Sequence, residues 1–518
     1  MLNIYKRLLL GGILSVLAAL PVSAQVNLPS AQFIPTTDGS AETRSVPFLT
    51  QATYLADWDY IEEEYLIVGK ANVYDYVDDA SSSPLVAVVQ PDVPYVTRMI
   101  VRRPAKQHKF RGTVYFDILN ATRGYDSDIV WYYSREMIMD EGAVYVGLTS
   151  KPTTVKFLRD EFGKLPYLPR NASRYATLAM TYDGQIWDML SQAAALLKAD
   201  GRADNPLAGF NVRRIILAGY SQSAGYVKTY VNSFHENAVL VDGRTAFDGY
   251  FEGAGSFASK VPNPPDSQHE FNPGGDPRNK TVLPAPAPVM RFQTETEVTS
   301  FFNSRATRQT EADSPWLRTY EMAGGAHVDA RQKEIEAQQD LDELGVISPW
   351  PDCTPEASNL SVEYVHSALL SRLDDWIKSG RKPPSSRLLS LIENDRGRVV
   401  VKTDATGNPV GGVRLPQLDV PTGVWSGASP VIWCILNGSY VPFSEAELDE
   451  RYPYHARYVQ QTFAAVVKAR REGFLLPRHG WSIYVEAFFA DIGARKAKGR
   501  WKHRRSSHGG QGAPDAVE

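Results

Sequence analysis

The chain has 518 residues, a formal net charge of −4 and two cysteines. This weakly acidic balance predicts no polyanionic partner, so we exclude nucleic-acid binding as a function. Residues 1–24 combine a basic start at Lys6 and Arg7, an apolar run to about Leu20 and a small-residue end at Ala24. This order predicts a secretory signal peptide cleaved near Ala24, and an uncleaved anchor is the alternative. Because no later stretch is apolar for the length of a membrane span, we expect a secreted or periplasmic protein without stable membrane insertion.

The chain after the signal peptide is predicted to fold as an α/β protein. Residues 25–47 form an extended lead-in, and residues 51–92 contain short β-rich runs. Further along, apolar strands alternate with helical segments, which predicts a mostly parallel central sheet with helices on both faces. The predicted strands are residues 95–102, 112–120, 142–148, 213–218, 248–251 and 288–293, and the predicted helices are residues 130–140, 183–198, 226–234 and 361–379.

Composition suggests how this chain is divided. Residues 48–384 are the predicted core, interrupted by a loop insertion at 256–288 that is rich in Pro, Gly and Asn. Residues 385–492 form an appended cap or companion region that closes with a helix from Ser444. The last segment, residues 493–518, carries seven Lys or Arg and no acidic residue between 495 and 505, which predicts a disordered, solvated tail; a dedicated binding patch is the alternative.

Ser221 is the predicted nucleophile. It lies in the motif Gly-Tyr-Ser-Gln-Ser at residues 219–223, directly after the buried strand 213–218 and directly before a helical run. A serine at a sharp strand-to-helix turn is held out of the sheet, and the turn needs small flanking residues. Gly219 is one of them, and Ser223 stands where the second glycine is usual. A chance match in an ordinary turn is the alternative.

His327 is the predicted general base, because a serine needs a neighbouring group to take its proton. In hydrolases built on this turn the chain order is nucleophile, acid, histidine. His327 follows Ser221 in a small-residue loop, Gly-Gly-Ala-His at residues 324–327, after a strand and before a helix. The other histidines lie before Ser221, in the tail, in the appended region or in helices, apart from His269, which lies in the loop insertion; His366 is interpreted as structural.

The acid is expected where the strand 288–293 ends. Glu295 and Glu297 both follow it, and in an extended strand residues two apart share a face, so periodicity does not separate them. We choose Glu297, which is further past the strand, and keep Glu295 as the alternative. Asp329 and the strand around residues 248–252 are weaker candidates, and a solvated pair of carboxylates is the remaining interpretation.

The oxyanion donors are predicted from two places. The Gln222 N–H lies at the start of the helix behind Ser221, where helix N–H groups favour negative charge. The second donor should come from the loop that begins with Asn120 and Ala121. Asn120 has an alternative interpretation as the residue that caps this turn.

The two cysteines, Cys353 and Cys434, are predicted to form a disulfide, because export places them in an oxidising compartment. Two buried free thiols are the alternative. Neither cysteine is near a second cysteine or a histidine cluster, so we expect no metal site. We also expect no cofactor.

Several of these segments resemble, in the same order, a family of mostly secreted bacterial α/β-hydrolase domain proteins. The segments are residues 112–120, 142–147, 219–224, 294–298, 324–327, 373–377 and 411–416, and the resemblance extends over residues 48–486. It implies an α/β-hydrolase fold and hydrolysis of carboxylic esters. Family members tend to have Asp where Glu297 stands, and Glu serves in this role in other hydrolases.

The predicted function is therefore a secreted serine hydrolase of the carboxylesterase kind. Its partner would be a small-molecule or polymer ester, which acylates Ser221 before hydrolysis. An acyltransferase with the same three residues is one alternative, since only access of the acceptor separates the two reactions. A catalytically idle binding protein on the same fold is another, although a binding module has no need of all three residues.

Overall fold

The structure is a computed structural model that describes residues 26–37, 43–165, 173–255, 259–263, 287–299, 313–345 and 353–493. The predicted signal peptide, most of the loop insertion and the tail beyond Gly493 lie outside the described residues. Within the described part of the chain, no helix is both long and apolar enough to cross a bilayer.

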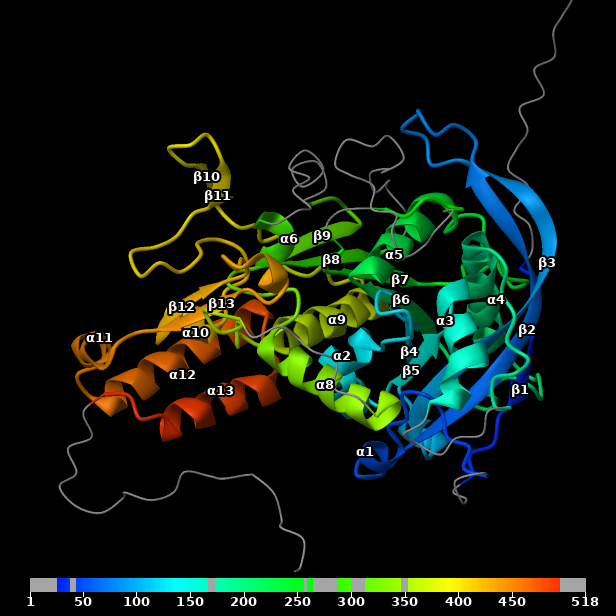
Figure 1. Cartoon of the computed structure of the whole chain (residues 1–518), viewed down its shortest axis with the longest axis horizontal. Helices are drawn as coiled ribbons and strands as arrows, with labels where there is room; N and C mark the ends of the chain where they lie inside the picture. The colour runs from blue at the N-terminus through cyan, green and yellow to red at the C-terminus, as the bar shows by residue number, and fades with distance from the viewer. Residues whose placement is uncertain are drawn as a thin grey trace, which may run out of the picture.

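A single large sheet organises the molecule (Figure 1). Its strand order is β1-β2-β3-β5-β4-β6-β7-β8-β9. The pairs among β1, β2, β3 and β5 are antiparallel, and every pair from β5 to β9 is parallel. The strands are β1 (Ser30–Phe33), β2 (Tyr60–Tyr76), β3 (Val86–Pro104), β4 (Thr113–Ile118), β5 (Val144–Leu148), β6 (Arg214–Tyr220), β7 (Gly249–Gly253), β8 (Val289–Thr294) and β9 (Leu317–Met322).

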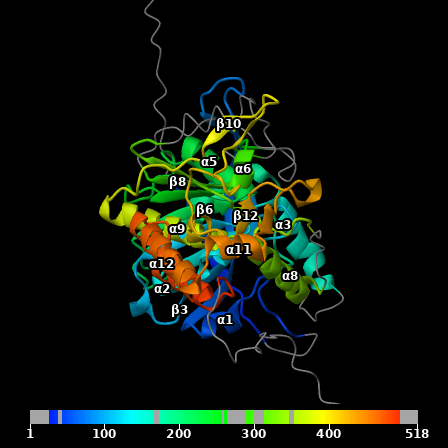
Figure 2. The ribbon, with the colours of Figure 1, turned by 90° about the vertical axis from the view of Figure 1, so that its left-hand side faces the viewer.

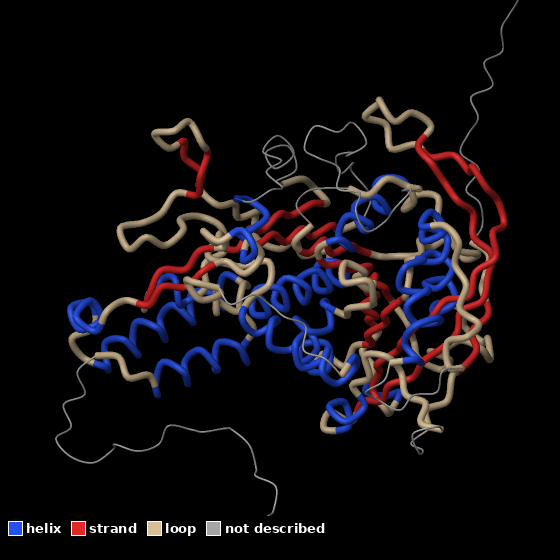
Figure 3. Tube along the Cα trace, viewed as in Figure 1, coloured by secondary structure: helices blue, strands red, loops and turns tan. Residues whose placement is uncertain are grey.

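Helices cover both faces of this sheet, as Figure 3 shows. On one face α4 (Ile186–Lys198) and α5 (Gln222–Ser233) pack into one apolar core. On the other face α2 (Ile129–Asp140) and α9 (Val362–Ser379) pack into a second. The central strands are buried on both faces, which explains their continuous apolar runs. Among the described residues of the core, the structure also has the α-helices α1 (Ala52–Ala56), α3 (Pro152–Lys156), α6 (Glu295–Thr299) and α8 (Ala330–Leu344).

The region after residue 384 extends the edge of the sheet. Arg387 and Val413 form parallel bridges with Tyr320 and Met322 of β9. Two small hairpins and four helices follow: β10 (Leu391–Glu393), β11 (Val399–Val401), α10 (Pro416–Asp419), β12 (Gly423–Ser426), β13 (Ser439–Pro442), α11 (Glu445–Arg451), α12 (His455–Glu472) and α13 (Pro477–Phe489). The single closing helix predicted from Ser444 is in fact three, because the helical conformation ends at Tyr452 and again at Gly473, which separates α11, α12 and α13.

The α/β fold with a mostly parallel sheet is confirmed, and a second local prediction is wrong. The short β-rich runs expected over residues 51–92 belong to two long antiparallel strands, β2 and β3. A register shift between Ala71 and Tyr74 lets this hairpin bend. The local pattern suggested short runs because burial changes along the hairpin, from buried residues near β5 to exposed residues near its tip.

Candidate active site

Ser221 occupies the turn between β6 and α5. Its backbone has φ 58° and ψ −122°, a conformation that costs a non-glycine residue about 1–3 kcal/mol. The Ser221 N–H donates to Gly253 O on the neighbouring strand at 2.8 Å, which holds the turn in place. A Cβ atom at Gly219 would lie 2.6 Å from the backbone of Ser223, so the turn requires glycine two residues before Ser221. The local chain thus has the strained geometry that presents a serine hydroxyl at the carboxyl end of the sheet.

His327 comes from the loop between β9 and α8. Its Nε2 lies 3.0 Å from Ser221 Oγ. The backbone around the ring is fixed twice: the His327 N–H donates to Thr296 Oγ1 at 3.0 Å, and His327 O accepts from the Tyr220 hydroxyl at 2.8 Å. Because Tyr220 directly precedes Ser221, this bond ties the histidine loop to the serine turn.

Glu297 lies on α6, the short helix that follows β8. Its Oε1 is 2.6 Å from His327 Nδ1, and its Oε2 accepts from the N–H of Thr294 at 2.6 Å and from the Thr294 hydroxyl at 2.7 Å. A carboxylate can only accept, so Nδ1 carries the proton and the Nε2 lone pair faces Ser221. The structure therefore brings Ser221, His327 and Glu297 into one hydrogen-bonded chain.

Glu295 points elsewhere, and our expectation that it shares a face with Glu297 is wrong. Both residues lie in a helix, where positions two apart are turned by about 200°. Glu295 Oε2 accepts from the Gly324 N–H at 2.8 Å, and its Oε1 accepts from Ser426 Oγ at 3.0 Å. Burial raises the pKa of Glu295 to about 7. Glu295 thus joins the histidine loop to β12 and makes no contact with the His327 ring.

The loop after β4 meets the first turn of α5. The Ala121 N–H donates to the Gln222 side-chain Oε1 at 3.3 Å, so it points to the residue next to Ser221. Asn120 is held differently: its N–H donates to Ser127 O at 2.9 Å, and its Nδ2 donates to Tyr220 O at 2.9 Å. Asn120 therefore anchors the turn, which is the alternative the sequence left open, and Ala121 is the better placed donor.

Buried ion pairs hold this loop against the sheet. Arg98 Nη1 on β3 lies 3.2 Å from Asp126, and Arg102 Nη1 lies 2.5 Å from Asp128. All four side chains are fully buried. Removing one partner from such a pair leaves an uncompensated buried charge, so these pairs fix the loop that carries Ala121.

A buried ammonium group joins the same loop to α5. Lys151 follows β5, and its Nζ donates to Leu119 O at 2.7 Å and to Ser223 Oγ at 3.2 Å. Burial lowers the pKa of Lys151 to about 7. Leu119 is two residues before Ala121, and Ser223 is two residues after Ser221. Sequence reasoning missed Lys151, because a single lysine after a strand is normally at the surface.

Comparison with known families identifies the fold. A family model described as an alpha/beta hydrolase domain matches residues 29–484. The chain belongs to this family. Among curated proteins, none matches the chain.

Several solved structures resemble this α/β-hydrolase at low identity. An α/β serine hydrolase homologue from Coxiella burnetii has 12% identity, covering 44% of this chain and 82% of its own, with a TM-score of 0.25. The rice cell wall degrading esterase LipA from Xanthomonas oryzae has 10% identity, 57% and 91% coverage and a TM-score of 0.29. Acetyl xylan esterase 1 from a Thermoanaerobacterium species has 9% identity, 57% and 80% coverage and a TM-score of 0.26. Family membership depends on the family match alone.

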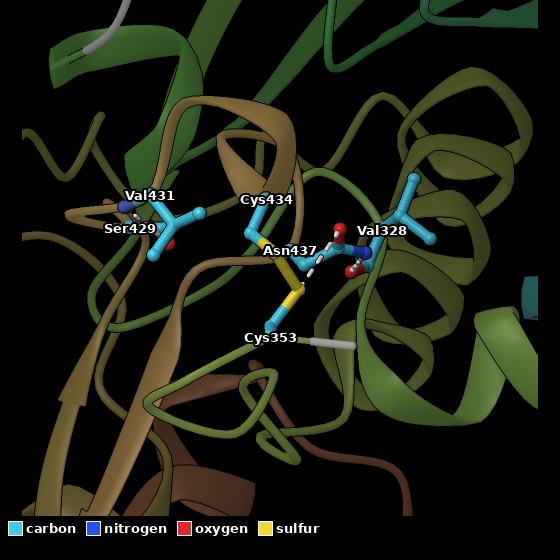
Figure 4. Close-up of a disulfide and its surroundings, with 6 residues drawn as sticks. All are labelled: Val328, Cys353, Ser429, Val431, Cys434 and Asn437. Carbon is cyan, nitrogen blue, oxygen red and sulfur yellow. Dashed lines mark hydrogen bonds between the residues drawn. A yellow bond between two sulfur atoms is a disulfide. The ribbon is translucent and has the colours of Figure 1, made fainter. Parts of the chain in front are cut away.

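The disulfide of this α/β-hydrolase lies beside the histidine loop (Figure 4). Cys353 and Cys434 are bonded, as predicted. Close to the bridge, Asn437 Nδ2 donates to Val328 O at 3.3 Å, and the Val328 N–H donates to Leu436 O at 2.8 Å. Because Val328 directly follows His327, the segment that holds Cys434 also fixes the histidine loop.

The C-terminal region also contacts α6, the short helix that carries Glu297. Thr296 Oγ1 donates to Gly427 O at 2.6 Å. A Cβ atom at Gly427 would lie 2.4 Å from Glu295 Cβ and 2.5 Å from Gly325 O. Only glycine permits this approach, so the strand end at Ser426 packs directly on both loops of the site. Sequence reasoning missed this contact, because nothing in the local pattern connects residue 427 to residue 296.

The other candidates have structural roles. Asp329 caps α8, with one carboxylate oxygen accepting from Gln332 N–H and the other from Val362 N–H, both at 2.7 Å. Asp248 and Glu252 pair with Lys198 and Arg291. Two other buried histidines bond within the core: His366 with Ser134 and His235 with Tyr250. His269 lies outside the described residues. In the part of the chain that the structure describes, no group of three or more His, Cys, Asp or Glu could hold a metal ion.

Proposed function

We propose that this α/β-hydrolase is a serine esterase that cleaves carboxylic esters through an acyl-enzyme on Ser221. One observation carries the proposal: Ser221 Oγ is 3.0 Å from His327 Nε2, and His327 Nδ1 is 2.6 Å from Glu297. This arrangement supplies a nucleophile, a base and an acid in the order of contact that serine hydrolases use.

In the acylation step, Ser221 Oγ attacks the ester carbonyl carbon and its proton moves to His327 Nε2. The carbonyl oxygen becomes an oxyanion, which the backbone N–H groups of Gln222 and Ala121 stabilise, with the oxyanion taking the place of Gln222 Oε1 at the Ala121 N–H. Glu297 stabilises the imidazolium cation without taking the proton. When the C–O bond to the alcohol breaks, His327 gives the proton to the leaving oxygen, and the acyl group stays on Ser221.

In the deacylation step, His327 takes a proton from water as the water oxygen attacks the acyl carbon. The same two N–H groups stabilise the second oxyanion. Collapse of this intermediate breaks the bond to Ser221 Oγ, which recovers its proton from His327 Nε2, and a carboxylic acid leaves. Each proton that His327 takes is returned, so proton transfer needs no acid or base outside the three side chains.

We also propose that the protein acts outside the cytoplasm. The bond between Cys353 and Cys434 fits an oxidising compartment. It agrees with the signal peptide predicted over residues 1–24. N-terminal sequencing of the exported chain should find Gln25 or a residue close to it.

Labelling with a fluorophosphonate probe tests the nucleophile. Ser221→Ala should remove labelling and lower ester turnover by about 10⁶-fold, because the three residues act as a unit. Ser233→Ala, at the other end of the same helix, is the matched control and should keep both the labelling and the ester turnover. Normal turnover in Ser221→Ala would sink the proposal, and an unlabelled wild-type chain would favour an idle binding protein. Adding an alcohol during turnover separates hydrolysis from acyl transfer, since a transferase would form mainly the new ester.

A further inference from the structure

The outer side of the α12–α13 hairpin carries an unusual surface. Five aromatic side chains form what we call the aromatic face: Phe463, Trp481, Tyr484, Phe488 and Phe489. Four of them are strongly exposed, with exposed fractions of 52% for Phe463, 67% for Trp481, 51% for Phe488 and 73% for Phe489. Single exposed apolar residues are ordinary on protein surfaces, whereas a continuous group of them marks an interaction site.

The aromatic face is continuous. Tyr484 links its members, with ring centroids 5.6 Å from Phe463, 5.7 Å from Trp481 and 6.5 Å from Phe488. The Phe488 ring lies 5.2 Å from that of Phe489. Trp481, Tyr484 and Phe488 are three and four residues apart along α13, so they follow one side of the helix.

The opposite side of α13 is already used to hold the hairpin on the core. His479 stacks on Tyr364 of α9 with ring centroids 4.7 Å apart. Ile483 and Ala487 are buried on this inner side. A helix that packs on its protein through one side normally carries polar residues on the other. In α13 much of that other side is aromatic.

The chain leaves the hairpin next to the aromatic face. His455 at the start of α12 lies within 2.9 Å of Ile492 O through Nδ1 and 3.0 Å of Phe488 O through Nε2. This contact places Gly493, the last described residue, at the end of the hairpin that holds Phe488. The sequence that follows carries seven Lys or Arg and no acidic residue between 495 and 505. Figures 1 and 2 show the hairpin at one end of the molecule, with the sheet on its other side.

We propose that the aromatic face docks the protein on an anionic lipid bilayer, and the basic sequence of residues 495–505, which follows the hairpin, argues for an anionic surface as the occupant. Tryptophan and phenylalanine side chains enter the boundary between headgroups and acyl chains, where their rings leave water. Lysine and arginine residues next to such a surface are attracted by anionic headgroups. The two features support each other, because neither a shallow apolar contact nor a basic segment gives firm attachment alone. The docking is peripheral and needs no spanning helix.

Vesicle co-sedimentation tests this proposal. The chain should begin at Gln25, so that the apolar run of the predicted signal peptide cannot itself bind lipid. Vesicles of phosphatidylglycerol and phosphatidylcholine in equal parts should bind it, and pure phosphatidylcholine vesicles should bind at least tenfold more weakly. Raising NaCl from about 50 mM to about 500 mM should weaken binding to the anionic vesicles, because salt screens the attraction.

Two variants and one control separate the contribution of the aromatic face from that of the basic segment. Trp481→Ser/Phe488→Ser/Phe489→Ser should weaken binding at least tenfold, and truncation after Gly493 should do the same while removing most of the salt dependence. Trp433→Ser is the matched control, since Trp433 is 72% exposed on a turn outside the hairpin and should leave binding unchanged. Thermal unfolding and turnover of a soluble ester should be unaltered in all of them, because the substituted side chains are at the surface.

Four results would overturn the proposal. The wild-type chain could fail to bind anionic vesicles, or the triple variant could bind as well as Trp433→Ser. A truncated chain that binds better than the full one would show that the tail covers the aromatic face. A triple variant that changes only the oligomeric state in sedimentation equilibrium would show that the occupant is a second copy of the chain.

Discussion

Replacing the acid of the proposed triad by its amide is the sharpest test of the site. The two carboxylate oxygens of Glu297 accept from three donors: His327 Nδ1, the Thr294 N–H and the Thr294 hydroxyl. Glutamine has only one oxygen. In Glu297→Gln, one of the two positions must therefore hold an NH₂ group that faces a donor.

The tautomer of His327 decides the size of the effect. The Thr294 N–H is fixed by the backbone and cannot become an acceptor, so the glutamine oxygen should stay with Thr294. Its NH₂ group then faces His327 Nδ1, which favours the tautomer with the proton on Nε2. That tautomer cannot accept the Ser221 proton, and the charge that stabilises the imidazolium is lost as well. We expect turnover to fall by about 10³–10⁴-fold, which corresponds to about 4–5.5 kcal/mol of transition-state stabilisation.

Glu295→Gln is the matched control, since it makes the same chemical change two residues away. Its oxygen can still accept from Gly324 or Ser426, so turnover should fall by less than about tenfold. Both variants should still react slowly with the fluorophosphonate probe, because Ser221 and the oxyanion donors remain. Steady-state kinetics on one soluble ester would check the pair. If Glu295→Gln were the impaired variant, the assignment from the hydrogen bonds would be refuted.

Three more predictions follow from the same geometry. Cys353→Ser/Cys434→Ser should lower the free energy of unfolding by about 2–4 kcal/mol, since the bridge closes a long loop; an unchanged urea midpoint would contradict this. Lys151→Met should lower kcat by about ten- to hundredfold with little change in KM, because it frees the two elements that carry the oxyanion donors. Lys198→Met, another buried lysine, should leave kcat intact, and equal losses in both would mean a general effect of destabilisation. Finally, native Glu295 keeps its proton up to about pH 7 while the unfolded chain loses it near 4.5, so stability should fall as pH rises through this window; thermal unfolding of Glu295→Gln should lack this component.

The sequence by itself predicted the parts of the site that depend on local order. A buried strand, a Gly-x-Ser turn and a helix follow one another within a short stretch around Ser221, and this order alone fixes where the hydroxyl emerges. The small-residue loop at His327 and the alternation of strands and helices are equally local signals. The disulfide was predictable because only two cysteines follow the signal peptide.

The tertiary structure was needed wherever two neighbouring candidate residues differ only in the distant residues that they contact. Glu295 and Glu297 could not be separated by periodicity, because the prediction treated them as a strand, whereas a short helix turns them apart. Asn120 and Ala121 were equivalent candidates until the structure distinguished their N–H groups: the Asn120 N–H donates to Ser127 O, whereas the Ala121 N–H donates to the Gln222 side chain, a hundred residues later. The physical reason is that local pattern reports which side of an element is buried. It carries no information on which distant donor or acceptor a side chain contacts there. In this protein, those contacts distinguish the candidate residues for each proposed role in the site.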